Sequence, residues 1–184
     1  MQIDDVDALK RAIGSGWSPE FLFFWGHTAK NQMIGKHVLS QWWPATFSVD
    51  GRTYATAEHY MMAQKAELFG DQETFAAILS ASDPSQAKSL GRRVRGFDEE
   101  RWVAHRIDVA VRGNLAKFGQ NPRLQDWLLA TGDAVLVEAS PVDRIWGIGL
   151  AANDARARDP DSWQGLNLLG FALMKTRDSL KSKQ

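Results

Sequence analysis

Residues 46–69, TFSVDGRTYATAEHYMMAQKAELF, decide the fold class, because the pattern changes within them from strand to helix. Two short segments of strand character, 46–49 and 53–54, flank Asp50-Gly51, a dipeptide typical of a hairpin turn. Helical periodicity then begins at Thr56, a residue suited to the N-cap position. The stretch therefore predicts a β-hairpin followed directly by a helix.

The sequence on either side of this stretch is mostly helical in pattern, with two more strand-like segments. Residues 21–25 and 134–139 are short apolar runs, and we expect the first to join the hairpin in a group of three strands. Capping residues and helix-ending glycines predict helices at residues 4–13, 71–80, 84–90, 99–117, 122–130 and 166–180. The predicted fold class is α+β, predominantly helical with a few short β-strands, in a single compact domain.

The composition excludes several classes of protein. Because 22 basic residues balance 22 acidic ones, no long-range field attracts a polyanion, although a local basic pocket for one phosphate stays open. The chain has no cysteine, which excludes disulfides, thiolate metal sites and a cysteine nucleophile. Its four histidines lack metal-ligand spacing, so no metal site is expected; they stand at 27, 37, 59 and 105.

Targeting signals are also missing from the pattern. The chain begins with an acidic segment rather than a basic one followed by an apolar core, so no secretory signal is expected. No apolar run approaches about 18 residues, so no membrane-spanning helix is expected. With the lack of cysteine, these features predict a cytoplasmic protein.

The helix predicted after Thr56 places two charged residues in an apolar face. That face carries Glu58, Met61, Met62, Lys65 and Phe69. Seven positions separate the two charges by about 10.5 Å along the axis, too far for an intimate ion pair. Each charge can pair with a group from another element, or both side chains can lean toward one ligand, and the periodicity alone favours separate partners.

A second group of polar and aromatic residues lies near the C-terminal end. Asp143-Arg144 follow a proline-containing turn and precede Trp146-Gly147, a layout suited to presenting a carboxylate and an aromatic face on a loop. The chain has eight tryptophans, whose flat faces can stack on bases, although for any single one of them the sequence favours core packing.

Several blocks of the sequence, in the same order, resemble the NADAR/YbiA-like family. The blocks are LSQWWP at 39–44, YATAEHYMMAQKA at 54–66, LVEASPVDRIWGIG at 136–149 and WQGLNLLG at 163–170. The resemblance extends over residues 21–180. Other members carry a Ser-Asn-Phe version of the block that reads Ser40-Gln41-Trp42 here, and this departure leaves the substrate open.

The resemblance implies a YbiA-like catalytic domain at residues 21–184, preceded by an N-terminal extension with a short helix at residues 1–20. It also implies an N-glycosidase that hydrolyses ribosylamine 5′-phosphates of riboflavin biosynthesis, such as 5-amino-6-(5-phosphoribosylamino)uracil, to base and ribose 5-phosphate. A related activity in the family is removal of ADP-ribose from guanine in nucleic acid. A third alternative is a module that binds ADP-ribose or a related nucleotide without turnover.

These substrates set the expected partners and cofactors. The partner is a small phosphoribosyl or ADP-ribosyl molecule, with ADP-ribosylated nucleic acid as the alternative, and no obligate protein partner is evident. In both substrates C1 of the ribose is joined to an exocyclic amine. Because such a glycosylamine is activated toward cleavage once it is protonated, neither a metal nor an organic cofactor is needed.

The implied chemistry suggests two mechanisms for the catalytic residues Glu58, Lys65 and Asp143. In the first, Lys65 captures the ring-opened sugar as a Schiff base while Glu58 shuttles protons. In the second, the ring stays closed, Glu58 or Asp143 steadies an oxocarbenium-like centre and positions water, and Lys65 only contacts ribose or phosphate. Both place a cleft between the helix of Glu58 and the loop of Asp143.

Other residues are expected to bind substrate. Arg92, with Arg144 as a further candidate, suits phosphate because a guanidinium offers paired donors. The remaining candidates are Trp102 and Trp146 as stacking faces for the base, Trp42 or Trp43 next, Gly147 beside Trp146, and Asn167. Asn167 can donate to a ribose hydroxyl or cap the last helix, and the sequence favours capping.

Overall fold

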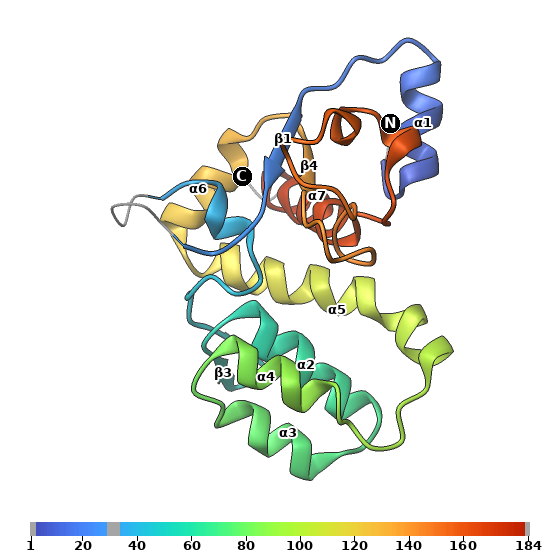
Figure 1. Cartoon of the computed structure of the whole chain (residues 1–184). Coiled ribbons are helices and arrows are strands. Elements are labelled where there is room, and N and C mark those ends of the chain that lie inside the picture. Colours follow the sequence, from blue (N-terminus) through green and yellow to red (C-terminus); the bar gives the residue numbers. More distant parts are fainter. Residues whose placement is uncertain (1–2, 29–33, 183–184) are drawn as a thin grey trace. The chain divides into compact units, whose positions relative to one another are not determined.

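The computed structural model describes residues 3–28 and 34–182. Their elements follow one another along the chain as drawn in Figure 1: α1 (Val6–Gly14), β1 (Phe21–Phe24), η2 (Lys36–Leu39), β2 (Phe47–Val49), β3 (Arg52–Tyr54), α2 (Ala57–Leu68), α3 (Gln72–Leu79), α4 (Pro84–Gly91), α5 (Glu99–Gly119), α6 (Pro122–Ala130), β4 (Val135–Glu138), η3 (Ala155–Arg158), η4 (Pro160–Ser162) and α7 (Leu168–Lys181). Every helix and strand that the sequence pattern predicts is present, within a few residues of the predicted bounds.

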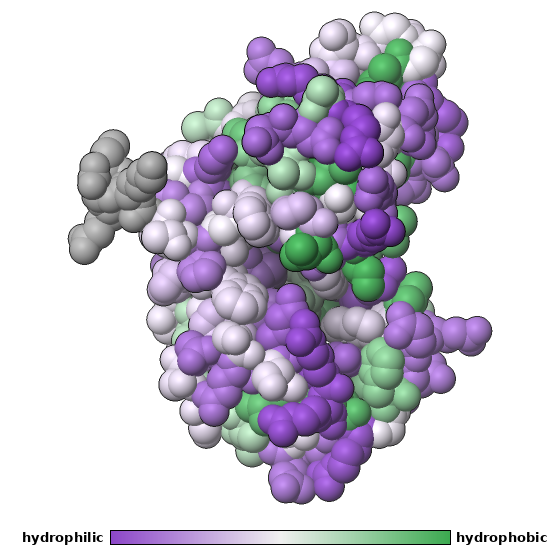
Figure 2. All heavy atoms as spheres, viewed as in Figure 1, coloured by the Kyte–Doolittle hydropathy of each residue, from purple (hydrophilic) through white to green (hydrophobic). Residues whose placement is uncertain are grey.

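The chain divides by its internal contacts into two units. The central unit is Gln41–Pro122, and the flanking unit combines Met1–Ser40 with Arg123–Gln184. Figure 2 shows that hydrophilic side chains cover most of one face, with hydrophobic side chains in small groups between them. No helix in the described part of the chain has both the length and the apolar character needed to cross a membrane.

The predicted hairpin is confirmed in the central unit. Strands β2 and β3 pair antiparallel, with Phe47 opposite Tyr54. The turn residues Asp50 and Gly51 have φ angles of 51° and 75°. Both lie in the left-handed region that a two-residue hairpin turn of this kind requires, and that Asp and Gly adopt more readily than bulky residues do.

Helix α2 follows the hairpin and forms the centre of the central unit. Its N-cap is Thr56, whose side-chain oxygen accepts a hydrogen bond of 3.3 Å from the His59 backbone N–H. Helices α3, α4 and α5 all pack against it (Figure 1). As a result its first two turns are buried all round, including Glu58, His59 and Tyr60. Burial therefore extends beyond the apolar face that the sequence pattern indicated, because neighbours enclose the helix on more than one side.

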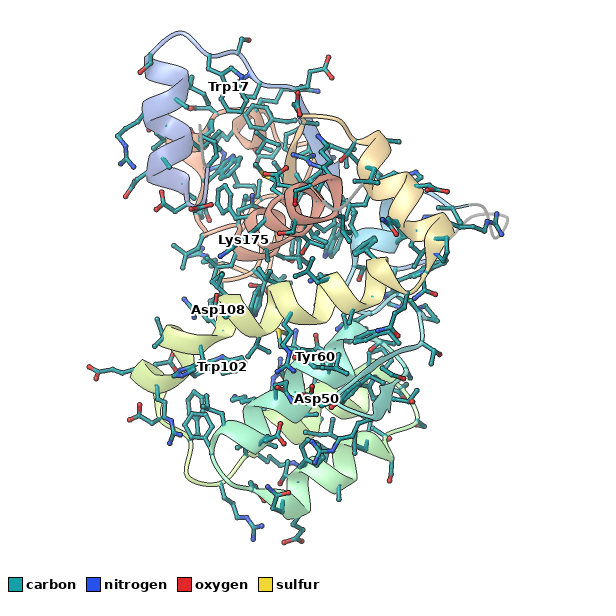
Figure 3. The ribbon with its side chains drawn as sticks, turned by 180° about the vertical axis from the view of Figure 1, so that it is seen from behind. Trp17, Asp50, Tyr60, Trp102, Asp108 and Lys175 are labelled. Atoms are coloured by element: carbon teal, nitrogen blue, oxygen red, sulfur yellow. The ribbon has the colours of Figure 1, made fainter. Side chains whose placement is uncertain are left out.

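Two glycines allow the helices of the central unit to approach α2 closely. A side chain at Gly91 of α4 would collide with Met62. A Cβ atom at Gly113 of α5 would lie 2.5 Å from a ring carbon of Tyr60. Figure 3 shows Tyr60 reaching from α2 toward α5 at this point. The missing side chains of these glycines make room for the large side chains of α2.

The flanking unit is built on a parallel pair of strands. β1 pairs with β4, with Phe21 opposite Val135 and Phe24 opposite Glu138. β4 is covered by α7, and its first three residues have no exposed surface. The expectation that β1 joins the hairpin was wrong, because β1 finds its partner more than 100 residues later in the sequence. Parallel strands need such a long crossover connection.

Helix α1 is part of the flanking unit. Its N-cap Asp5 accepts a hydrogen bond of 2.6 Å from the backbone N–H of Ala8. Leu9 is fully buried, and Lys10 forms an ion pair of 3.1 Å with Asp161 of η4. The apolar side of this short helix is therefore packed within the flanking unit.

Candidate active site

Glu58 lies in the first turn of α2 and is only 3% exposed. Its backbone N–H donates a hydrogen bond of 3.0 Å to the carbonyl oxygen of Gln41. The Gln41 side chain is also buried and donates a hydrogen bond of 3.1 Å to Asn114 of α5. Gln41 belongs to the block in which this sequence departs from the family it resembles, so the departure lies directly at the start of α2.

Lys65, two turns further along α2, is half-buried against aromatic side chains. Its Nζ atom lies 4.1 Å from the centre of the Phe97 ring and 5.7 Å from the Trp102 ring. Burial lowers the pKa of Lys65, and the negative charge of Glu99 opposes this shift. Loss of water around the ammonium disfavours the charged form, which makes the neutral amine easier to reach.

Trp102 and Phe97 differ in their accessibility. Trp102, near the start of α5 in Figure 3, is 8% exposed, whereas Phe97 in the preceding loop is 41% exposed. Trp102 was predicted as a stacking face for the base, but its burial beside Lys65 leaves little of its ring surface for a ligand.

Phe97 was not predicted from the sequence, although a signal for it exists. Asp98 is the N-cap of α5 and accepts a hydrogen bond of 2.7 Å from the backbone N–H of Arg101. Phe97 therefore stands just before the cap and Trp102 four positions after it, where apolar residues often form a hydrophobic staple. The staple positions explain why two aromatic residues come together beside α2.

The other binding candidates of the central unit are more open. Arg92 is the C-cap residue of α4 and is exposed. Trp42 is half-buried, and Nζ of Lys88 lies 5.8 Å from its ring centre. An exposed guanidinium and an accessible indole remain suited to a phosphate and a base.

Asp143, in the flanking unit, organises its own loop. One oxygen of its carboxylate accepts hydrogen bonds of 2.8 Å from the backbone N–H groups of Ile145 and Trp146. Its backbone N–H donates to the hydroxyl of Ser140 at 3.2 Å. These bonds fix the turn that carries Trp146, which is half-buried.

Gly147 and Asn167 hold this loop against β4. A Cβ atom at Gly147 would lie 2.8 Å from the Glu138 carbonyl oxygen. Asn167 is fully buried; its side chain accepts a hydrogen bond from the Glu138 N–H and donates one to the Leu136 carbonyl, both at 2.9 Å. Within the described residues this side chain makes no capping bond to α7, so the capping interpretation of Asn167 was wrong.

Arg144 lies beside a cavity of about 430 Å³ in the flanking unit. Its guanidinium donates to the Gln164 side chain at 3.1 Å. Asp5 and Asp7 line the same cavity, and their charges would repel a phosphate. This surrounding disfavours Arg144 as the phosphate ligand and leaves Arg92 as the candidate.

The structure thus gathers the predicted site residues into two groups. Glu58, Lys65 and Trp102 belong to the central unit, and Asp143 and Trp146 to the flanking unit. The cleft that would bring the two groups together remains a prediction. Across residues 3–28 and 34–182, no cluster of three His, Cys, Asp or Glu residues could hold a metal ion.

Comparison with known proteins identifies the family of this chain. Residues 23–181 match the model of the NADAR domain. The chain is 46% identical over 164 residues to an N-glycosidase of Acanthamoeba polyphaga mimivirus, covering 86% of this chain and 95% of that protein. It is 34% identical over 143 residues to a riboflavin biosynthesis protein of Vibrio vulnificus, covering 78% of this chain but only 35% of the longer Vibrio protein.

The fold is similar to a solved structure as well. The NMR structure of the Escherichia coli protein YbiA superposes with a TM-score of 0.72 at 28% sequence identity, covering 91% of this chain and 88% of YbiA. This similarity confirms the predicted fold class, α+β and mostly helical.

Proposed function

The chain belongs to the NADAR domain family, and from that premise we propose that it hydrolyses a ribosylamine 5′-phosphate of riboflavin biosynthesis. It is a hydrolase of N-glycosyl bonds, as the name of its mimivirus relative states for that protein. The products are the free base and ribose 5-phosphate. The similarity to the Vibrio riboflavin biosynthesis protein supports this substrate class.

The observation that carries the proposal is the environment of Lys65. Its amine is half-buried between aromatic rings, and burial lowers its pKa. A lysine must be neutral to attack carbon, and removal from water increases the neutral fraction near pH 7. An amine in this state is suited to attack C1 of a ring-opened sugar.

The reaction begins when the glycosylamine opens to an imine between C1 and the base nitrogen. The lone pair of Lys65 Nζ attacks C1, which then carries both nitrogens. After a proton passes to the base nitrogen, the bond from C1 to that nitrogen breaks and the base leaves as a neutral amine. Water adds to the iminium that remains on Lys65, and collapse of the adduct releases the aldehyde of ribose 5-phosphate and the free amine of Lys65.

Glu58 is the proton carrier in this scheme. A buried carboxylate on the same helix can take the proton that Nζ loses on attack and give a proton to the departing base. Its burial, at 3% exposure, keeps bulk water from exchanging these protons. The helix geometry separates its position from that of Lys65 by about 10.5 Å, so both side chains must extend toward the sugar.

The competing closed-ring mechanism would use Asp143 or Glu58 to stabilise an oxocarbenium-like centre. The two backbone hydrogen bonds to one Asp143 oxygen favour a role in shaping the loop instead. In the flanking unit, Asp143, Gly147 and Asn167 therefore position Trp146 as a candidate stacking face. In the central unit, Arg92 and Trp42 are the candidates for binding the phosphate and the base. Residues 21–184 form the catalytic domain and residues 1–20 its extension.

The decisive experiment incubates the pure protein with the riboflavin-pathway phosphoribosylamine and with ADP-ribosylated guanine, in the presence and absence of borohydride. We expect release of base and ribose 5-phosphate from the first substrate. Borohydride should add the mass of a reduced sugar phosphate at Lys65. Release from ADP-ribosylated guanine alone would move the assignment to the alternative substrate, and tight binding of ADP-ribose without any turnover would identify a binding module.

Three lysine variants make this experiment specific. Lys65→Ala should lose both turnover and the mass adduct. Lys65→Arg keeps the positive charge but offers no neutral amine at pH 7, so it should lose the adduct too. Lys175→Ala removes an exposed amine from α7 and should behave as the unchanged protein. Turnover without any adduct at Lys65 would support the closed-ring mechanism.

A further inference from the structure

Phe97 contacts the reacting nitrogen of the proposed mechanism. The distance of 4.1 Å between Lys65 Nζ and the Phe97 ring centre is shorter than the 5.7 Å to Trp102. Both lie within the range of about 6 Å in which a cation is attracted to an aromatic face. Phe97 is therefore the nearer of the two aromatic walls around this amine.

Neighbouring side chains support the Phe97 ring. Phe69, at the end of α2, meets it edge to face with ring centres 5.4 Å apart. The guanidinium of Arg101 lies 5.6 Å from the Phe69 ring centre. Phe97 also stands at a staple position before α5, so the ring is packed on one side while 41% of the residue stays exposed. A ligand can therefore reach the exposed part of Phe97 beside the Lys65 amine.

The geometry points to Phe97 as a further catalytic residue, whose π face stabilises the positive charge that develops on Lys65 Nζ when the base leaves. This inference rests on the proposed Schiff-base function. In that step the lone pair of Nζ forms a double bond to C1, and the electron pair of the bond from C1 to the base passes to the protonated base nitrogen. The positive charge then resides on Nζ, the atom next to the ring.

The Phe97 ring acts on the Lys65 nitrogen both before attack, when it must be neutral, and after the base has left, when it is cationic. Before attack the nitrogen must be neutral, and the apolar surroundings disfavour its ammonium form. After the base has left, the nitrogen is cationic, and its half-buried position limits its solvation by water. The negative face of an aromatic ring stabilises a desolvated cation more than an exposed one. An aliphatic side chain of similar size would exclude water equally but would supply no such stabilisation.

The difference between an aromatic and an aliphatic side chain at position 97 defines the test. Phe97→Leu keeps the apolar bulk and removes the π face, whereas Phe97→Tyr keeps the face and serves as the matched control. The rate at which borohydride traps the sugar on Lys65 is measured in a single turnover. We expect Phe97→Leu to trap about threefold to thirtyfold more slowly, and Phe97→Tyr to remain within about twofold of the unchanged protein.

A second readout needs no substrate. The pKa of Lys65 is measured by NMR titration of the ligand-free protein, in which Glu99 is the charged group that acts on this amine. Loss of the π face should lower the pKa of Lys65 in Phe97→Leu, whereas Phe97→Tyr should leave that pKa unchanged. Circular dichroism of both variants checks that they are folded, and we expect spectra like that of the unchanged protein.

The outcomes separate this inference from the proposed function. If the unchanged protein forms no adduct at Lys65, the Schiff base fails and the role of Phe97 in it fails as well. If the adduct forms and Phe97→Leu traps it as fast as Phe97→Tyr, with the pKa of Lys65 unaltered, the Schiff base stands and only the inference about Phe97 is overturned.

Discussion

The side-chain amide of Asn167 donates a hydrogen bond of 2.9 Å to the carbonyl oxygen of Leu136, and its oxygen accepts one of the same length from the Glu138 N–H. Residues two apart on a strand direct these groups to the same edge. The amide of one side chain thus takes the place of a neighbouring strand along β4. The φ angle of Asn167, 51°, is in the left-handed region, which Asn tolerates better than most residues.

Asn167→Asp should destabilise the protein by about 3 kcal/mol. The change replaces the donor that faces the Leu136 carbonyl with a second acceptor and introduces a buried charge. Urea unfolding measures the effect, with Asn153→Asp at an exposed position as the control. Equal unfolding midpoints for the two variants would contradict the role assigned to Asn167.

Gly113→Ala should also destabilise, although alanine favours helices. Its Cβ would lie 2.5 Å from the Tyr60 ring, and overpacking of this kind costs about 1–3 kcal/mol. Gly14→Ala in α1 is the matched control, because a Cβ there meets no atom within 4 Å among the described residues. The control should gain up to about 1 kcal/mol in thermal unfolding. A stabilised Gly113→Ala would mean that α5 can move away from Tyr60.

Lys117 of α5 should make stability depend on pH. Burial lowers its pKa to about 7, whereas in the unfolded chain the pKa is the ordinary 10.5. Between these values the unfolded state binds one proton more, so the free energy of unfolding rises with pH by about 1.4 kcal/mol per pH unit from this group. Below pH 7 the contribution is constant.

Urea unfolding between pH 7 and 9 measures this slope. Lys117→Met should remove it, because methionine has no titrating group, whereas Lys175→Met at an exposed position should keep it. If the slope is the same in the unchanged protein and in Lys117→Met, the lysine is charged in the folded state across this range.

Glu58→Gln should reduce turnover by about 10²-fold to 10⁴-fold while the protein stays folded, because the amide cannot carry a proton. Glu67→Gln on the same helix is the control. Its carboxylate forms an exposed ion pair of 3.0 Å with Arg52, and loss of such a pair has little effect. Turnover of Glu58→Gln at the rate of the control would exclude proton transfer by Glu58.

Local features of this fold follow from the sequence because neighbouring residues determine them. The turn at Asp50-Gly51 and the cap at Thr56 depend on side chains within a few positions along the chain, so the hairpin and the start of α2 were predicted correctly. The residue pattern alone also placed Glu58 and Lys65 on one face of the helix, although it favoured separate partners for the two charges.

Only the tertiary structure decided which distant groups meet. Nothing near β1 in sequence indicates that it pairs with β4, nor that Asn167 bonds that strand instead of capping α7. The enclosure of α2 and the contact of Phe97 with Lys65 likewise depend on packing between helices. Local hydrogen bonds and φ preferences act over a few residues, whereas such contacts arise when distant apolar surfaces bury one another, and that choice is made by the whole chain.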